Sequence, residues 1–166
     1  ISKRKTLGRL CTEVVKILII EKSPDTFDSG IKENTIMEKK PFVTKSQVEE
    51  IVKTYPTPFH LYDEKGIREN AKAVKEAFAW NPNFREYFAV KATPNPYILK
   101  ILQDYDMGCD CSSYTELMLA KSCGFDGKHI MFSSNDTPAE EFAYADELGA
   151  IINLDDFTHI DFLEKT

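Results

Sequence analysis

The sequence predicts an α/β fold in which repeated strand–helix units build a parallel sheet. From Phe84 onward, short apolar runs alternate with segments whose apolar residues recur at helical spacing. The runs end near residues 91, 111, 133 and 154, so successive ends lie 20, 22 and 21 residues apart. Units of such even length imply parallel strands with right-handed crossovers, arranged either as the first half of a (β/α)₈ barrel or as part of an open doubly wound sheet.

Three elements are expected before these units. Thr44 and Gln47 form a capping box in front of an apolar stripe, which predicts a helix. Two prolines end this helix, and Phe59–Tyr62 then reads as a strand. A long helix follows, and its inward face is made by Ile67, Ala71, Val74 and Phe78.

Each later unit carries its own boundary signals. The run Tyr87–Val90 is apolar on both faces and ends in Lys91, as in a strand that is covered on both sides. Capping patterns precede the next helices at Asn95–Pro96, Ser113–Glu116 and Thr137–Glu140. The remaining strands are expected at Gly108–Ser112, Ile130–Phe132 and Ala150–Leu154, and Asp156 is expected to cap a last helix.

The composition indicates a packed protein with an acidic balance of charge. The chain has 166 residues, of which 42% are hydrophobic and 29% charged, and its net charge is −6. An acidic chain disfavours nucleic acid or an anionic membrane as a partner, because both are bound through clustered Lys and Arg. No apolar run approaches the roughly 20 residues that span a bilayer. We therefore expect a cytoplasmic protein that acts on a small molecule.

The four cysteines, Cys11, Cys109, Cys111 and Cys123, do not have the spacing of a disulfide framework. Cys109 and Cys111 form a Cys-x-Cys pair, but a metal site would need two further ligands, and only His129 is near in sequence. We expect reduced, half-buried thiols beside a strand and no metal.

The residues before the regular pattern are harder to place. A short helix or strand around Thr12–Ile20 precedes a polar stretch, and we expect residues 1–36 to be poorly ordered or upstream sequence. Residues 37–63 are expected to form an N-terminal helix and strand, and residues 64–166 a partial barrel. The chain starts at Ile1 and Met37 is a candidate start, so we expect a fragment of a longer protein.

Chemistry is expected at the carboxyl ends of the strands, where ligands bind in both candidate architectures. Lys91 is the leading candidate, because an amine at the end of a buried strand is partly desolvated, and the neutral amine is the nucleophile that forms a Schiff base. The alternative is a lysine whose stem packs on apolar surface while its head reaches water. Asp110 is either a negative partner in the same pocket or a turn-forming residue. The other polar positions at this edge are Thr93, Ser112, Ser113, Ser133 to Asp136, Asn153 and Asp155.

Four sequence blocks between Thr57 and Lys165 resemble one known family. They are TPFHLYD, YFAVKATPNP, GCDCSSYTEL and HIMFSSND, and their order and spacing agree as well as their letters. The chain in this region is similar to the amino-terminal part of the fold-type-III decarboxylases, which act on meso-diaminopimelate, ornithine, arginine or carboxynorspermidine. The resemblance implies an α/β fold that is the first half of a (β/α)₈, alanine-racemase-like barrel, truncated, with pyridoxal 5'-phosphate as its cofactor.

The resemblance also implies roles for three residues. Lys91 would hold pyridoxal phosphate covalently, Ala89 would pack near the cofactor, and Asp110 would lie beside it at the end of the next strand. The TPFHLYD block commonly joins a carboxy-terminal β-domain in this family, so Phe59–Tyr62 need not be a barrel strand. Diaminopimelate decarboxylase is the favoured member, and the ornithine, arginine and carboxynorspermidine enzymes are alternatives.

Other parts of the family's active site are expected outside residues 1–166. These are a stacking histidine, a Gly-rich phosphate loop, an acid for the pyridine nitrogen, and a cysteine and a tyrosine from the second domain. We therefore expect this chain to be inactive alone, and the resemblance implies a homodimer for the full-length family. Two alternatives are a non-catalytic, regulatory relative and an open doubly wound nucleotide-binding domain, although the latter lacks its usual Gly-rich loop.

Overall fold

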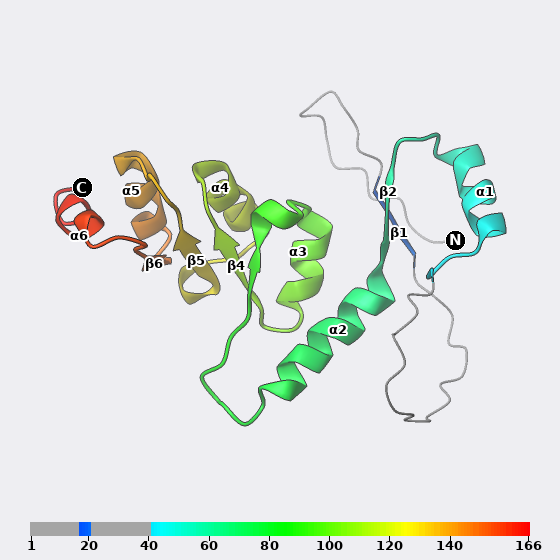
Figure 1. Cartoon of the computed structure of the whole chain (residues 1–166), viewed down its shortest axis with the longest axis horizontal. Helices are drawn as coiled ribbons and strands as arrows, with labels where there is room; N and C mark the ends of the chain where they lie inside the picture. The colour runs from blue at the N-terminus through cyan, green and yellow to red at the C-terminus, as the bar shows by residue number, and fades with distance from the viewer. Residues whose placement is uncertain (1–16, 21–40) are drawn as a thin grey trace. The chain divides into compact units, whose positions relative to one another are not determined.

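The computed structural model describes residues 17–20 and 41–166 (Figure 1). The chain divides into two compact units, residues 1–65 and 66–166. In the first unit, strand β1 (Ile17–Ile20) pairs in parallel with β2 (His60–Asp63). The strand β1 lies within the Thr12–Ile20 segment, and the prediction that residues 1–36 are poorly ordered otherwise falls outside the described residues. The predicted division at residues 36 and 63 stays a prediction.

Helix α1 (Lys45–Thr54) has the predicted capping box. The Thr44 hydroxyl accepts the backbone N–H of Gln47 at 3.3 Å, and the Gln47 side chain accepts the backbone N–H of Thr44 at 2.7 Å. Two of the orphan donors at the helix start are thereby paired. The apolar stripe is only partly covered: Val48 and Ile51 are half-buried, and Val52 is exposed.

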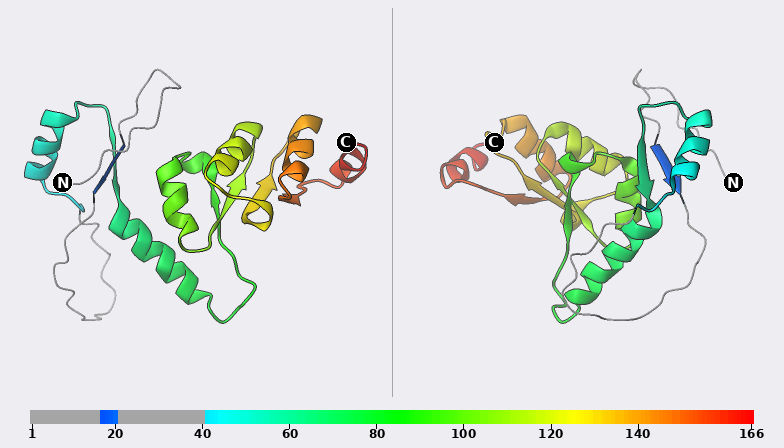
Figure 2. Two further views of the ribbon diagram at one scale, coloured as in Figure 1. Left: turned by 180° about the vertical axis from the view of Figure 1, so that it is seen from behind. Right: turned by 45° about the vertical axis from the view of Figure 1, so that its right-hand side comes forward.

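The second unit is a parallel sheet with strand order β3-β4-β5-β6, and the strands are joined by helices (Figures 1 and 2). This arrangement confirms the predicted βα repeat. Helices α3, α4 and α5 lie along one face of the sheet. The bounds are α2 Glu64–Ala77, β3 Tyr87–Ala89, α3 Pro96–Gln103, β4 Gly108–Cys111, α4 Tyr114–Ser122, β5 Ile130–Ser133, α5 Ala139–Glu147, β6 Ile151–Asn153 and α6 Thr158–Leu163.

Most helix starts follow the sequence signals, and two do not. The predicted cap at Asp156 is wrong, because α6 begins at Thr158 and Phe157 occupies the cap position, although Asp156 accepts the Thr158 N–H at 2.7 Å. Asn95 caps α3 by accepting the N–H of Tyr97 at 3.0 Å, as predicted. The predicted cap at Thr137 is wrong, because α5 begins at Ala139 and Pro138 occupies the cap position without a side-chain hydrogen bond. The Thr137 hydroxyl is buried there without a partner in the described part of the chain.

The core of this unit lies between the sheet and helices α3 to α5. Side chains alternate along each strand, so one face of the sheet carries Cys109, Cys111, Ile130 and Phe132, which are all fully buried. They pack with buried side chains of the three helices, namely Leu99, Leu117, Ala120, Phe142 and Ala145.

The opposite face is open among the described residues. Ala89, Asp110 and Met131 lie side by side in register and are half-buried, and Ile151 continues the row at 42% exposure. The expectation of a sheet covered on both faces is therefore wrong for the described chain. The apolar character of Tyr87–Val90 reflects packing on one face and this partly open row on the other.

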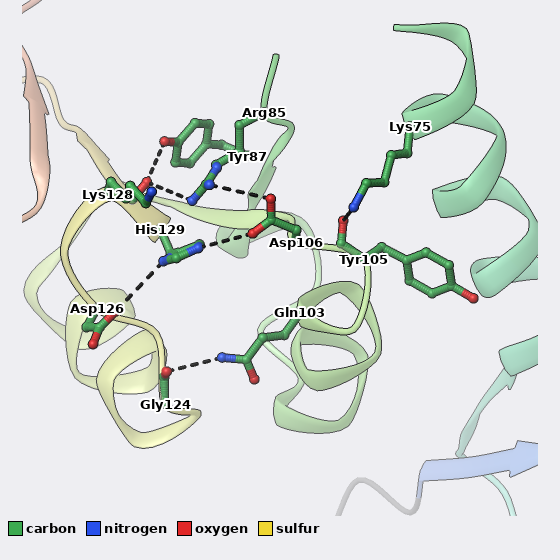
Figure 3. A network of polar contacts seen from close by, with 10 residues as sticks. All are labelled: Lys75, Arg85, Tyr87, Gln103, Tyr105, Asp106, Gly124, Asp126, Lys128 and His129. Atoms are coloured by element: carbon green, nitrogen blue, oxygen red, sulfur yellow. Dashed lines mark hydrogen bonds and ion pairs between the residues drawn. The ribbon is translucent and has the colours of Figure 1, made fainter. Parts of the chain in front are cut away.

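A set of polar contacts, which we call the amino-edge clasp, joins the loops before β3, β4 and β5 (Figure 3). Asp106 lies between Arg85 and His129, with its carboxylate oxygens 3.4 Å from Arg85 Nη2 and 3.2 Å from His129 Nε2. Tyr87 donates its hydroxyl to the Lys128 carbonyl at 2.6 Å. The clasp ties together the starts of the three strands.

Candidate functional site

The predicted site residues lie along the edge at which the four strands end, which we call the carboxyl edge. Ala89 ends β3, Lys91 follows it, and Asp110 is the third residue of β4, in register with Ala89. The structure thus brings Lys91, Ala89 and Asp110 to adjoining strand ends, as expected for parallel neighbours. The roles assigned to these residues stay predictions.

Lys91 is not at the end of a buried strand, and this corrects the sequence prediction. Strand β3 ends at Ala89, and Val90–Ala92 form a short 3-10 turn that buries Val90 and leaves Lys91 exposed. The predicted desolvation assumed cover on both faces of the sheet, which the described residues do not provide. The exposed Lys91 side chain is therefore accessible to a ligand from solvent.

Asp110 is held from the neighbouring strand. The Ser133 hydroxyl donates to Asp110 Oδ1 at 2.5 Å, and both residues are half-buried. Asp110 faces Met131 in the ladder, so this bond runs diagonally to the residue two positions on, which lies on the same face. A hydrogen bond to a charged acceptor is among the stronger ones in proteins, so it fixes the direction of this carboxylate.

The start of α4 supplies further polar groups to this edge. Ser113 caps the helix by accepting the N–H of Glu116 at 3.4 Å. The Glu116 carboxylate accepts the backbone N–H of Ser112 at 2.8 Å. In the predicted capping box it would instead accept the backbone N–H of the cap residue, Ser113. Glu116 is therefore engaged in shaping the loop after β4, as its capping interpretation implied.

A second set of polar contacts connects the segments that follow β5 and β6, and the sequence analysis missed one of its three residues. Asn135 Nδ2 donates to Asp155 Oδ2 at 2.6 Å, and Asp155 Oδ1 lies 3.0 Å from Nδ1 of His159. Asn135 and Asp155 were predicted to lie at this edge, but His159 was not considered. Its position four residues after Asp155, at the start of a helix, is the sequence signal that could have identified it.

The thiols belong to the core and not to the site. Cys109, Cys111 and Cys123 are free and buried. Burial raises the pKa of the Cys109 thiol to about 12 and raises the pKa of the Cys111 and Cys123 thiols as well. They are buried more completely than predicted. Within residues 17–20 and 41–166, no group of three or more His, Cys, Asp or Glu side chains is placed to hold a metal, and no helix there is long and apolar enough to cross a membrane.

The carboxyl edge carries an exposed amine after β3 and a hydrogen-bonded carboxylate on β4. An exposed primary amine can condense with an aldehyde, and a carboxylate on the next strand can orient a heteroaromatic ring. This donor set fits the aldehyde-bearing part of a cofactor such as pyridoxal phosphate. No Gly-rich loop for a phosphate group follows β3, β4, β5 or β6 in the described chain.

Comparison with known proteins identifies a family to which most of the chain is similar. Residues 64–166 match the family model described as "Pyridoxal-dependent decarboxylase, pyridoxal binding domain". The chain is 48% identical over 109 residues to Protein TabA of Pseudomonas amygdali pv. tabaci, an alignment that covers 66% of this chain and 26% of that protein. It is 37% identical over 81 residues to diaminopimelate decarboxylase of Bacteroides thetaiotaomicron, covering 49% of this chain and 21% of that enzyme.

Solved structures show the same fold. Diaminopimelate decarboxylase of Helicobacter pylori, complexed with L-lysine, superposes with a TM-score of 0.66 at 33% identity, covering 71% of this chain and 30% of that one. Lysine decarboxylase of Selenomonas ruminantium has a TM-score of 0.68 at 24% identity and supports the fold alone. The chain spans about a quarter of the length of these curated relatives and about a third of these solved structures.

Proposed function

Because the chain belongs to the pyridoxal-dependent decarboxylases, through their pyridoxal binding domain, we propose that it forms the amino-terminal part of an amino-acid decarboxylase. Its fold is the corresponding part of a (β/α) barrel. The observation that supports the proposal is that the exposed Lys91 follows β3 at the carboxyl edge, where the last residue of β3, Ala89, is in register with Asp110 of β4. This is the edge at which parallel α/β proteins bind their ligands.

Each of the three proposed cofactor residues has a position that suits its role. Lys91, which is exposed, would hold pyridoxal phosphate covalently at Nζ. Ala89 is small and in register with Asp110, so it would leave room for a ring between the two strand ends. Asp110, fixed by the Ser133 hydroxyl, would orient that ring.

The chemistry then divides between the cofactor and the protein. When bound, pyridoxal phosphate supplies an electron sink for the electron pair left on the substrate when CO₂ departs. The chain's own residues bind and orient: Lys91 anchors the reactive group, and Asp110 with Ser133 sets its direction. The chain spans only about a quarter of the length of its curated relatives, so we propose that this chain alone has no decarboxylase activity.

We propose meso-diaminopimelate as the substrate and L-lysine as the product, within lysine biosynthesis. Diaminopimelate decarboxylases are prominent among the relatives, at up to 37% identity. Ornithine, arginine and carboxynorspermidine are the alternatives, because the identity to Protein TabA is higher and that name states no substrate. We also infer a cytoplasmic homodimer, as the family resemblance implies.

The cofactor assignment is tested by trapping. The purified chain is incubated with one equivalent of pyridoxal phosphate, reduced with borohydride and mapped by peptide mass spectrometry. We expect the label on Lys91 and a yellow absorbance before reduction. Lys91→Ala should remove both, whereas Lys100→Ala, which alters an exposed lysine of α3, should remove neither. Equal labelling of all exposed lysines would contradict the proposal.

The substrate is tested by CO₂ release from the four candidate amino acids, using the purified chain and any longer product of its gene. We expect release from meso-diaminopimelate by the longer product and none from the 166-residue chain. A clear rate from the isolated chain would overturn the proposed inactivity. A longer product that is trapped at Lys91 but decarboxylates none of the four would favour the non-catalytic alternative.

A further inference from the structure

His159 occupies a position that the proposed chemistry does not use. Its side chain is only 22% exposed, and it lies against the ring of Phe142, with the ring centres 6.2 Å apart. Nδ1 is 3.0 Å from Asp155 Oδ1, at ion-pair distance but off the direction of a linear hydrogen bond. An imidazole in this setting is fixed in place by its surroundings.

Several residues connect His159 to the Asp110 carboxylate. Asp155 uses one carboxylate oxygen for His159 and the other for the Asn135 amide. Asn135 is two residues beyond Ser133, whose hydroxyl holds Asp110. The intervening Ser134 is 8% exposed. Short contacts therefore join His159 to Asp155 and Asp155 to Asn135, a hydrogen bond joins Ser133 to Asp110, and the backbone through the buried Ser134 connects the two sets.

We propose that His159 is a positioning residue: through Asp155 and Asn135 it holds the loop after β5, and thereby keeps the Ser133 hydroxyl directed at the Asp110 carboxylate. The importance of this for cofactor binding rests on the proposed function. The positioning itself is a property of the chain without any ligand. It can therefore be tested separately.

The amino-edge clasp offers a matched control. His129 is also paired with an aspartate at 3.2 Å, and its side chain is 30% exposed, but it lies before β5, at the other end of the strand. His159→Leu and His129→Leu each remove one imidazole and its close contact with an aspartate carboxylate. A general loss of stability should follow from both changes, whereas an effect on Asp110 should follow only from the first.

The readout is nuclear magnetic resonance of the intact chain labelled with ¹³C at aspartate carboxyl groups and ¹⁵N at asparagine amides. In His159→Leu we expect the Asp110 carboxyl resonance and the Asn135 side-chain amide resonances to shift. In His129→Leu they should stay unchanged. His159→Asn should restore them, because an asparagine amide nitrogen can occupy the place of Nδ1 and donate to Asp155. His159→Gln should restore them less, because its amide lies one bond further out.

The consequence for the cofactor is measured in parallel. The yield of borohydride-trapped label on Lys91 should fall about threefold in His159→Leu, the size expected for loss of one polar contact worth about 0.6 kcal/mol, and recover in His159→Asn. If His159→Leu does not fold, Asn135→Ala removes the middle of the path and should shift Asp110 in the same way.

Unchanged Asp110 and Asn135 resonances in His159→Leu, or equal changes in His129→Leu, would overturn the positioning role. Absence of label on Lys91 in the unaltered chain would instead count against the proposed function, and the resonance shifts would still decide the role of His159.

Discussion

Phe132 allows the helix-facing core to be tested with an internal comparison. The side chain is fully buried in β5, and its ring meets that of Phe142 edge-on, with the ring centres 6.0 Å apart and the planes at 89°. Truncation of a buried Phe to Ala costs about 3–5 kcal/mol, and an edge-to-face pair contributes about 0.5–1.5 kcal/mol beyond burial. Phe132→Ala should therefore lower the free energy of unfolding by about 4 kcal/mol, a large part of the roughly 5–15 kcal/mol of an ordinary domain.

The assay is urea unfolding followed by far-ultraviolet circular dichroism, with Phe157→Ala as the control. Phe157 is 91% exposed, so the same change of residue should alter the free energy of unfolding by less than about 0.5 kcal/mol. The Phe132→Ala/Phe142→Ala double variant should lose less than the sum of the two single variants, because both lose the same ring contact. Equal losses in Phe132→Ala and Phe157→Ala would refute the assignment of the core to this face.

Three further predictions concern packing and pH. Gly108→Ala should destabilise the chain by about 1–3 kcal/mol in the same unfolding assay, because a Cβ there would lie 2.5 Å from the Tyr87 ring and 2.7 Å from a backbone oxygen; an unchanged midpoint would contradict this. The raised pKa of Cys109, about 12 against an ordinary 9.0, means that its stabilising effect is complete below pH 9 and is lost as the pH rises towards 12. Cys109→Ala should show a shallower alkaline loss of stability than the unaltered chain. The pKa of Asp156 is lowered by its hydrogen bonds to the hydroxyl and N–H of Thr158, so that contact is present above the ordinary carboxyl pKa and lost as acid brings the pH through the lowered value. Asp156→Asn should keep the Thr158 amide resonance constant over that acid range, where the unaltered chain shows it moving.

Local signals in the sequence were enough to place most elements. Asn95–Pro96 and Thr44–Gln47 specify helix starts through contacts within one turn, so they do not depend on the rest of the fold. The even spacing of the apolar runs predicted parallel strand neighbours, which brought Lys91 and Asp110 to adjoining ends. Thr137 was misplaced because the proline that follows it serves as the cap instead, one residue later than expected.

What the sequence could not supply was the environment of each side chain. The burial predicted for Lys91 assumed cover on both faces of the sheet, and an apolar run does not reveal which of its faces has a partner. The contacts from Asp110 to His159 join three segments that are distant in the sequence: Asp110, the Ser133–Asn135 segment and the Asp155–His159 segment. The pairing of β1 with β2 likewise joins residues that are 43 positions apart in the sequence, such as Ile17 and His60.

The separation between the two ends of the strands has a consequence for how such a protein can change. The amino-edge clasp secures Arg85, Asp106 and His129 at the strand starts, far along each strand from the residues that would meet a substrate. Loops at the carboxyl edge can therefore vary in length and composition while the contacts of the amino-edge clasp are retained. Variation at that edge can give a new substrate preference, whereas variation at the clasp affects whether the protein folds at all.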